Sequence, residues 1–147
     1  MNKSVILLQL EELGFSIEQV DEDFYFFDYE ELKILYMPDN EDDSFLRFAI
    51  PYIYDVTEEN KPFVLEVVND TNLAIKYSKT CVYKDTVWIF YEHRIFEEVD
   101  LGELLEHTLM LLKATYYLFH RKIEGDDTFP YDDDGDNNET EEEENDE

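Results

Sequence analysis

Cysteine, glycine and basic residues are all scarce in this chain, and each shortage excludes a class of structure or activity. The single cysteine, Cys81, excludes an intramolecular disulfide and, with no export signal, favours a reducing compartment. Four glycines, none clustered, exclude the usual glycine-rich phosphate loops. The 11 basic residues face 39 acidic ones, and the resulting net charge of −28 repels nucleic-acid backbones and anionic membranes. We therefore expect a cytoplasmic protein that binds neither nucleic acid nor a membrane.

The acidic residues are distributed unevenly, and this divides the chain in two. Residues 126–147 hold thirteen acidic residues and no basic one, whereas residues 1–125 hold the other 26 acidic and all 11 basic residues, a net charge of −15. The acidic segment has no apolar periodicity and cannot bury enough apolar surface to fold alone. The sequence predicts one folded domain over residues 1–125 and a disordered acidic tail over 126–147.

The period of the apolar residues predicts an α+β domain: an antiparallel five-stranded sheet with three helices, in the order αβββαββα. Asp100 is a good helix N-cap with Glu103 three residues later, Lys84–Asp85 suits a two-residue hairpin turn, and Pro51 should end strand pairing. The predicted helices are 4–13, 57–77 and 100–121, and the predicted strands are 23–29, 32–37, 45–51, 79–83 and 86–92.

Three predicted strands and the last helix are more apolar than a half-covered sheet requires. Half-buried strands alternate apolar and polar residues, but 24–27, 34–37 and 87–91 are apolar on both faces. Within 108–119 the only charged residue is Lys113, so apolar residues nearly surround this helix. Either the helix lies centrally on the sheet between the other two, or one apolar face is covered by a second subunit or a partner segment.

Residues with catalytic or metal-binding chemistry are few. His107 and His120 are thirteen positions apart and cannot form a helical metal pair, whereas Glu103 and His107 share a helix face and more often make a surface contact than a metal site. Cys81 has no neighbouring histidine in the sequence, and a strand cysteine is usually inert. We expect no catalytic residues, no metal site and no cofactor.

Several segments resemble the YbjN-like domain proteins of bacteria, which share the architecture of type III secretion chaperones. The resemblance is carried by DFYFFDYEELKILYMP, FLRFAIPYIYDV and VLEVVNDTNLAIKYSKTCVYKDTVWIFYE, and it includes Tyr29-Glu30, Val68-Asn69 and Asn72. It covers residues 15–119 and departs from the pattern at Glu31, where such proteins commonly have glycine. The resemblance implies a small, frequently dimeric α+β domain that binds protein and is not an enzyme.

These observations favour a non-enzymatic protein-binding module, chaperone-like or a regulatory adaptor of a bacterial cytoplasm. It would hold a partner segment on apolar surface with acidic rims that favour a basic partner. It would also form a homodimer, which by analogy with the chaperone-like fold we expect through a face of the second helix together with strand 79–83. The alternative is a small enzyme or metal-dependent regulator that uses Cys81, His93 or His107. The residues we predict to contact a partner are Val64, Val68, Asn69, Asn72, Tyr83, Trp88, Tyr116 and Tyr117.

Two asparagines in the predicted second helix allow two interpretations. Asn69 and Asn72 are three positions apart and share a face, although asparagine is a poor helix former. We favour a structural role in which they hold the helix to a strand edge or a loop. The alternative is a direct contact with a partner.

The acidic tail should be dispensable for folding. A chain that ends at Gly125 should melt at the same temperature as the full chain or slightly higher, because removing thirteen negative charges lowers self-repulsion. Thermal unfolding at moderate salt measures this. A melting temperature several degrees lower in the shortened chain would show that the tail packs on the domain.

Overall fold

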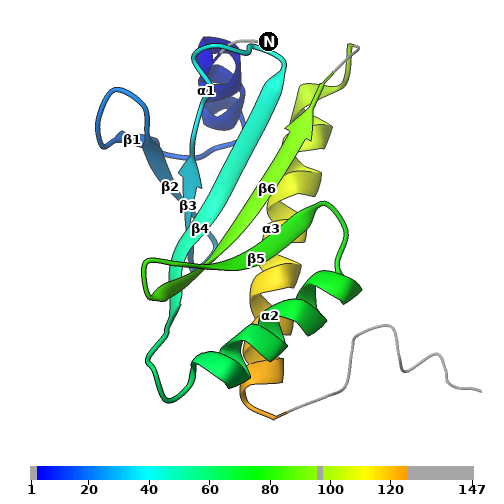
Figure 1. Cartoon of the computed structure of the whole chain (residues 1–147). Helices are drawn as coiled ribbons and strands as arrows, with labels where there is room; N and C mark the ends of the chain where they lie inside the picture. The colour runs from blue at the N-terminus through cyan, green and yellow to red at the C-terminus, as the bar shows by residue number, and fades with distance from the viewer. Residues whose placement is uncertain (1–2, 96–97, 126–147) are drawn as a thin grey trace, which may run out of the picture.

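The structure, a computed structural model, describes residues 3–95 and 98–125, so the predicted tail lies outside the described residues (Figure 1). The fold is α+β with three helices and an antiparallel sheet, as predicted, but the sheet has six strands instead of five. The helices are α1 (Lys3–Glu12), α2 (Lys61–Ala74) and α3 (Leu101–Ile123). The strands are β1 (Glu18–Gln19), β2 (Tyr25–Tyr29), β3 (Leu32–Tyr36), β4 (Phe45–Asp55), β5 (Ser78–Tyr83) and β6 (Thr86–Arg94).

The strand order is β1-β2-β3-β4-β6-β5, and every neighbouring pair is antiparallel. The additional strand, β1, pairs Glu18 with Phe26 and Gln19 with Tyr25. Two exposed residues carry no apolar period, so no sequence signal marks this strand.

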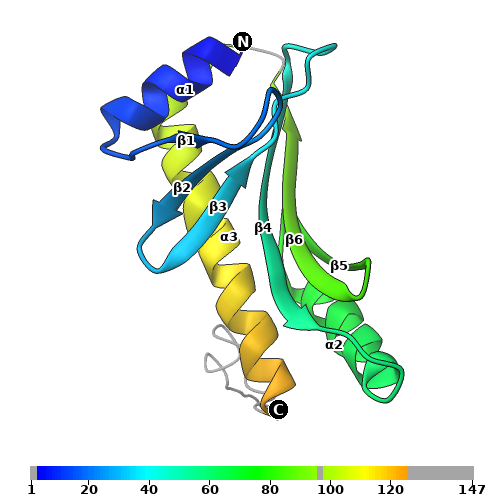
Figure 2. The same cartoon turned by 90° about the vertical axis from the view of Figure 1, so that its left-hand side faces the viewer.

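Strand β4 continues past Pro51, which was expected to end it. The pairing of β3 with β4 reaches no closer to Pro51 than Leu35 opposite Ala49, and beyond this point the two strands diverge (Figure 2). The missing N–H of Pro51 therefore leaves no group of β3 without a partner. On its other side β4 is interrupted, since Tyr52 has a left-handed φ of 56°, and pairing with β6 resumes at Tyr54. A proline at a local strand edge therefore produces a break in β4 and does not end it.

The predicted hairpin turn at Lys84–Asp85 and the predicted N-cap of α3 at Asp100 are confirmed, but α2 is shorter than predicted. Lys84 and Asp85 both have positive φ, and the Asp100 carboxylate accepts a hydrogen bond from the Glu103 N–H at 3.1 Å. At the start of α2 the N–H groups and side chains of Thr57 and Asn60 exchange hydrogen bonds of 2.8 and 3.1 Å, which form a closed turn ahead of the helix.

One face of the sheet packs on the helices. Side chains at alternate positions of β2, β3, β4 and β6 meet α1 and α3 in the main core, and Val64 and Val67 of α2 pack with Val87 and Phe119 in a smaller one. Helix α3 runs along this face (Figure 1) and buries Leu105, Leu109 and Leu112 against it. The position of α3 on the sheet therefore explains the apolar residues on one side of this helix. The opposite side leaves Met110 and Tyr117 exposed.

The other face of the sheet has no helix in its hydrophobic cluster among the described residues, and we call it the helix-free face. Its apolar residues come from strands or from positions directly beside them, and they form a cluster of their own: Phe24, Phe26, Leu35, Met37, Ala49, Cys81, Trp88 and Phe90. Leu35 and Ala49 are buried even here, because the larger aromatic side chains close over them. The apolar excess in the sequence is thus divided between cores on opposite faces of one sheet.

Asn72 joins α2 to the sheet edge at β5, in agreement with its structural interpretation. Its amide accepts the Thr80 N–H at 2.7 Å and donates to the Thr80 carbonyl at 3.1 Å. The Thr80 hydroxyl adds a third contact with the same amide at 3.0 Å. Since β5 is the last strand, these bonds occupy backbone groups that would otherwise face a free edge.

Replacing Asn72 should destabilise the domain much more than replacing Asn69. Asn72→Ala leaves the backbone groups of Thr80 without their partner and should cost about 1–3 kcal/mol. Asn69→Ala, at an exposed position one turn earlier, should stay within about 0.5 kcal/mol. Urea unfolding of both variants measures the difference, and equal losses would contradict the assignment.

Candidate functional site

The helix-free face carries two adjoining pockets, of about 200 and 410 Å³, which together form what we call the trough. Both pockets are lined by Phe24, Met37, Tyr52 and Trp88, so they form one continuous depression. The other lining residues are Val20, Phe26, Leu35, Pro51, Tyr83, Lys84 and Phe90. A lining of aromatic rings and flexible methionine suits apolar side chains of varied shape.

Trp88 lies at the centre of the trough. Its ring meets Tyr52 and Tyr83 edge-on, at centroid distances of 5.1 and 5.5 Å, and stacks on Phe90 at 5.6 Å. The indole N–H donates to the Thr86 hydroxyl at 3.0 Å. Because its only hydrogen-bonding group is satisfied within the strand, Trp88 offers the trough an apolar surface.

Tyr52 forms one wall of the trough in a conformation that tyrosine rarely adopts. Its φ of 56° lies in the left-handed region, which costs about 1–2 kcal/mol for a residue with a Cβ atom. The break in β4 holds it there, and the residue is 70% exposed. Backbone strain of this kind is concentrated at functional sites. Tyr52 was not among the predicted contact residues, although the preceding Pro51 marked the irregularity.

Charges on the strands of the helix-free face are balanced, in contrast to the chain as a whole. Lys33 pairs with Asp28 at 3.3 Å, and the Glu92 carboxylate pairs with Arg47 at 3.6 Å and with Lys79 at 2.6 Å. Glu18, opposite Phe26, and Asp55, opposite Thr86, bring the acidic strand residues on this face to four, and Arg94 of β6 brings the basic ones to four as well. The described strands at the trough therefore carry no excess of acidic residues. Acidic residues do lie beside it in a turn, where Asp21, Glu22 and Asp23 are exposed between Val20 and Phe24, which both line the trough.

The three residues of the enzyme alternative do not meet. Cys81 belongs to the helix-free face, where burial raises the pKa of its thiol and the Lys79 ammonium only partly offsets this. His93 and His107 lie on the opposite side of the sheet, where they flank the Tyr77 ring at 5.9 and 6.5 Å. Among residues 3–95 and 98–125, no three His, Cys, Asp or Glu side chains gather as a metal site would require.

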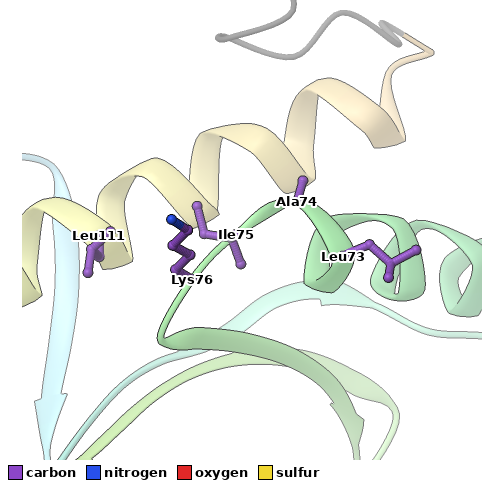
Figure 3. Close-up of a pocket in the computed structure, with 5 residues that line it drawn as sticks. All are labelled: Leu73, Ala74, Ile75, Lys76 and Leu111. Atoms are coloured by element: carbon purple, nitrogen blue, oxygen red, sulfur yellow. The ribbon is translucent and has the colours of Figure 1, made fainter.

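A second apolar groove, of about 490 Å³, lies on the helical side where the end of α2 meets the middle of α3 (Figure 3). It is lined by Leu73, Ala74, Ile75, Lys76 and Leu111. Leu73 is 79% exposed, the highest fraction among the large apolar side chains described. This groove and the trough are two places where apolar surface remains outside the cores.

The eight residues predicted to contact a partner fall in three places. Tyr83 and Trp88 lie together in the trough, and Tyr116 and Tyr117 are in ring contact at 5.3 Å on α3. The other four belong to α2, where Val64 is fully buried, Val68 is partly buried, and Asn69 and Asn72 lie further along the helix. The spacing of apolar residues in the sequence could show that Val64 lies on the apolar face of a helix. It could not show whether that face contacts the core of the domain or a partner.

No described helix combines the length and the hydropathy needed to cross a bilayer.

Comparison with solved structures identifies a YbjN-like fold. The crystal structure of YbjN, a candidate transcription regulator from E. coli, superposes with a TM-score of 0.61 at 8% identity, over 82% of this chain and 91% of that one. The crystal structure of an uncharacterized protein from Methanothermobacter thermautotrophicus gives a TM-score of 0.53 at 12% identity, over 83% of this chain and 99% of that one. No family model matches the sequence. No curated protein matches it either.

The Cys81 thiol should react slowly. Because burial raises its pKa, little thiolate forms near neutral pH, and alkylation by iodoacetamide should accelerate only at strongly alkaline pH. Cys81→Ser should cost about 1 kcal/mol, because a hydroxyl replaces a thiol among apolar neighbours. Rapid alkylation of the native protein at pH 7, followed by mass spectrometry, would contradict this and revive a nucleophilic role.

Proposed function

We propose that this chain is a non-enzymatic protein-binding module, chaperone-like or a regulatory adaptor, that holds a segment of a partner protein in the trough. The observation that carries the proposal is the trough itself, an apolar depression outside the helical layer whose wall includes a strained, exposed Tyr52. The YbjN-like fold is consistent with this class of function.

The shape of the trough favours a short extended segment over a globular surface. Its two pockets adjoin and share four lining residues, so neighbouring side chains of one segment can occupy both. Alternate side chains of an extended chain point the same way, about 7 Å apart, which suits two adjoining apolar pockets. Tyr52, Phe24 and Met37 join the predicted Tyr83 and Trp88 as contact residues.

Charge supports a basic partner at long range and apolar contacts at short range. The net charge of −15 over residues 1–125 attracts cationic segments and raises their association rate. At the trough the strand charges balance, and Lys84 is the only charged residue among those that line the two pockets. The preferred segment therefore has apolar residues for the pockets and Lys or Arg on either side of them.

The separation of Cys81 from His93 and His107 supports this proposal over the enzyme or metal-regulator alternative. The sheet lies between the thiol and the two imidazoles, so these residues form no pair of nucleophile and base. The raised pKa of the Cys81 thiol is a second argument against the enzyme alternative, because a nucleophilic cysteine needs a lowered pKa.

Selection from a random peptide display library on the immobilised full chain tests the proposal. Enriched peptides should carry apolar residues at alternate positions with basic residues beside them. The strongest peptide, made synthetically, is then titrated against wild type and variants. A selection that enriches no sequence pattern, or only acidic peptides, would contradict the proposal.

Tyr52→Gly should separate binding from stability. Glycine removes the left-handed strain but loses the Tyr52–Trp88 ring contact, so the free energy of unfolding should change by less than about 1 kcal/mol. Peptide affinity should fall about tenfold or more, since one wall of the trough is lost. Calorimetric titration and urea unfolding give the two quantities.

Tyr77→Gly is the matched control for this variant. Tyr77 is also exposed and left-handed, with a φ of 67°, but it lies with His93 and His107 on the helix-covered side of the sheet. It should keep wild-type peptide affinity. Equal losses in the two variants would show that the peptide does not bind in the trough.

A further inference from the structure

Helix α3 presents an exposed row of residues with the spacing of a coiled-coil seam. Its members are separated by three or four positions, the spacing at which side chains line one side of a helix that packs on another. Met110 is 52% and Tyr117 46% exposed in this row. The row, which we call the α3 seam, consists of Glu103, His107, Met110, Ala114 and Tyr117, which are exposed, and Arg121 at its end, which is half-buried.

From this pattern we propose that the α3 seam docks on the α3 seam of a second copy of the chain, with the two helices antiparallel. A two-fold axis midway between Met110 and Ala114 places each member opposite a complementary one. Met110 meets the small Ala114 of the second copy, and Tyr117 meets His107. At both ends Glu103 meets Arg121. An interface with two-fold symmetry must be complementary to itself. The order of side chains along the α3 seam meets this requirement.

Charge gives an independent argument for a second copy at this place. Helix α3 holds two acidic residues, Glu103 and Glu106, and three basic ones, Lys113, Arg121 and Lys122, whereas the chain carries −28. The acidic residues lie in its first half and the basic ones in its second, where Lys113 is already paired with Glu30 at 2.7 Å and Arg121 and Lys122 lie at the end of the helix. Antiparallel packing therefore sets each acidic half against a basic half, on a helix that contributes almost nothing to the repulsion between copies.

Neighbouring apolar residues extend the contact beyond the seam. Leu73 lines the groove that reaches Leu111, and Tyr77 lies 6.5 Å from His107. The seam spans most of α3, which is about 35 Å long. Stable interfaces begin at a total buried area of about 1,200 Å², so the contact must include these neighbours as well as the seam.

The surface formed by α2 and β5, through which we expected the homodimer to form, is less suitable. Asn72 already satisfies the N–H and carbonyl of Thr80 at the β5 edge, so a strand of a second copy would find these groups occupied. The most exposed part of α2, Leu73, belongs to the groove beside α3. The α3 seam and the trough lie on opposite sides of the sheet, so both can be occupied at once.

Sedimentation equilibrium of the full chain, from about 1 to 100 μM, tests the proposal. The wild type should be in monomer–dimer equilibrium in this range at moderate salt. A monomer throughout, at both low and high salt, overturns the proposal.

Charge reversal at the seam ends separates this contact from a general effect of net charge. Glu103→Lys should weaken the dimer about tenfold because it sets a second cation against Arg121 at both ends, although it lowers the net charge and should otherwise favour association. Arg121→Glu should weaken it similarly. The double variant Glu103→Lys/Arg121→Glu restores opposite charges at the original net charge, so its dimer should return to within about threefold of wild type.

Two further variants complete the set. Ala114→Lys places a long cation where Met110 of the second copy must approach, at an exposed position that does not disturb the core, and should leave only monomer. Glu41→Lys, in the exposed β3–β4 loop, changes the net charge as Glu103→Lys does and should leave the dimer unchanged or slightly tighter. Circular dichroism confirms that each variant is folded. If Glu103→Lys and Glu41→Lys behave alike, or if Ala114→Lys still dimerises, the seam is not the interface.

Discussion

The pairing of β4 with β6 decides which residues lie on each face of the sheet, and the rest of the structure depends on it. Opposite β6, β4 sends Leu46, Phe48 and Ile50 toward the helices and Ala49 and Pro51 toward the helix-free face. The same register sends Val87, Ile89 and Tyr91 to the helices and Trp88 and Phe90 away from them. A shift of one residue would exchange these sets. The interruption at Tyr52 occurs within the pairing that fixes the register, and the trough forms beside it.

Most of the elements could be predicted from the sequence, because strong local signals agreed with the global fold. Asp100, the Lys84–Asp85 turn and the long apolar runs each specified their element by local chemistry. Three features depended on tertiary context instead. Strand β1 has no apolar period, the start of α2 is delayed by the Thr57–Asn60 turn, and Pro51 is tolerated only because β3 has already diverged from β4. Asn72 is an intermediate case, where a poor helix former indicated a bond whose partner, Thr80, only the fold could supply.

The candidate site was harder to predict than the fold for a physical reason. An apolar residue in a strand looks the same in sequence whether it packs under a helix, under its own aromatic neighbours or in an open pocket. Trp88 and Tyr83 were identified, but Val64, equally apolar, lies in the core. Tyr52 escaped notice because its significance is its left-handed backbone. The net charge could be predicted from the sequence, but the positions of the charged residues in the fold could not. Acidic residues are not in excess on the strands around the trough or on helix α3.

In our two proposals, surfaces on opposite sides of one sheet have separate roles: the trough holds a partner segment, and the α3 seam joins two copies of the chain. Of these, the trough is central. Nuclear magnetic resonance of the labelled full chain with a peptide selected on it tests this most directly. The Trp88 indole N–H and the backbone amides of Met37, Tyr52 and Phe90 should show the largest shift changes, because they surround the two pockets. Changes concentrated instead on Leu73 to Lys76 and Leu111, with the trough signals unmoved, would contradict the assignment of the binding site.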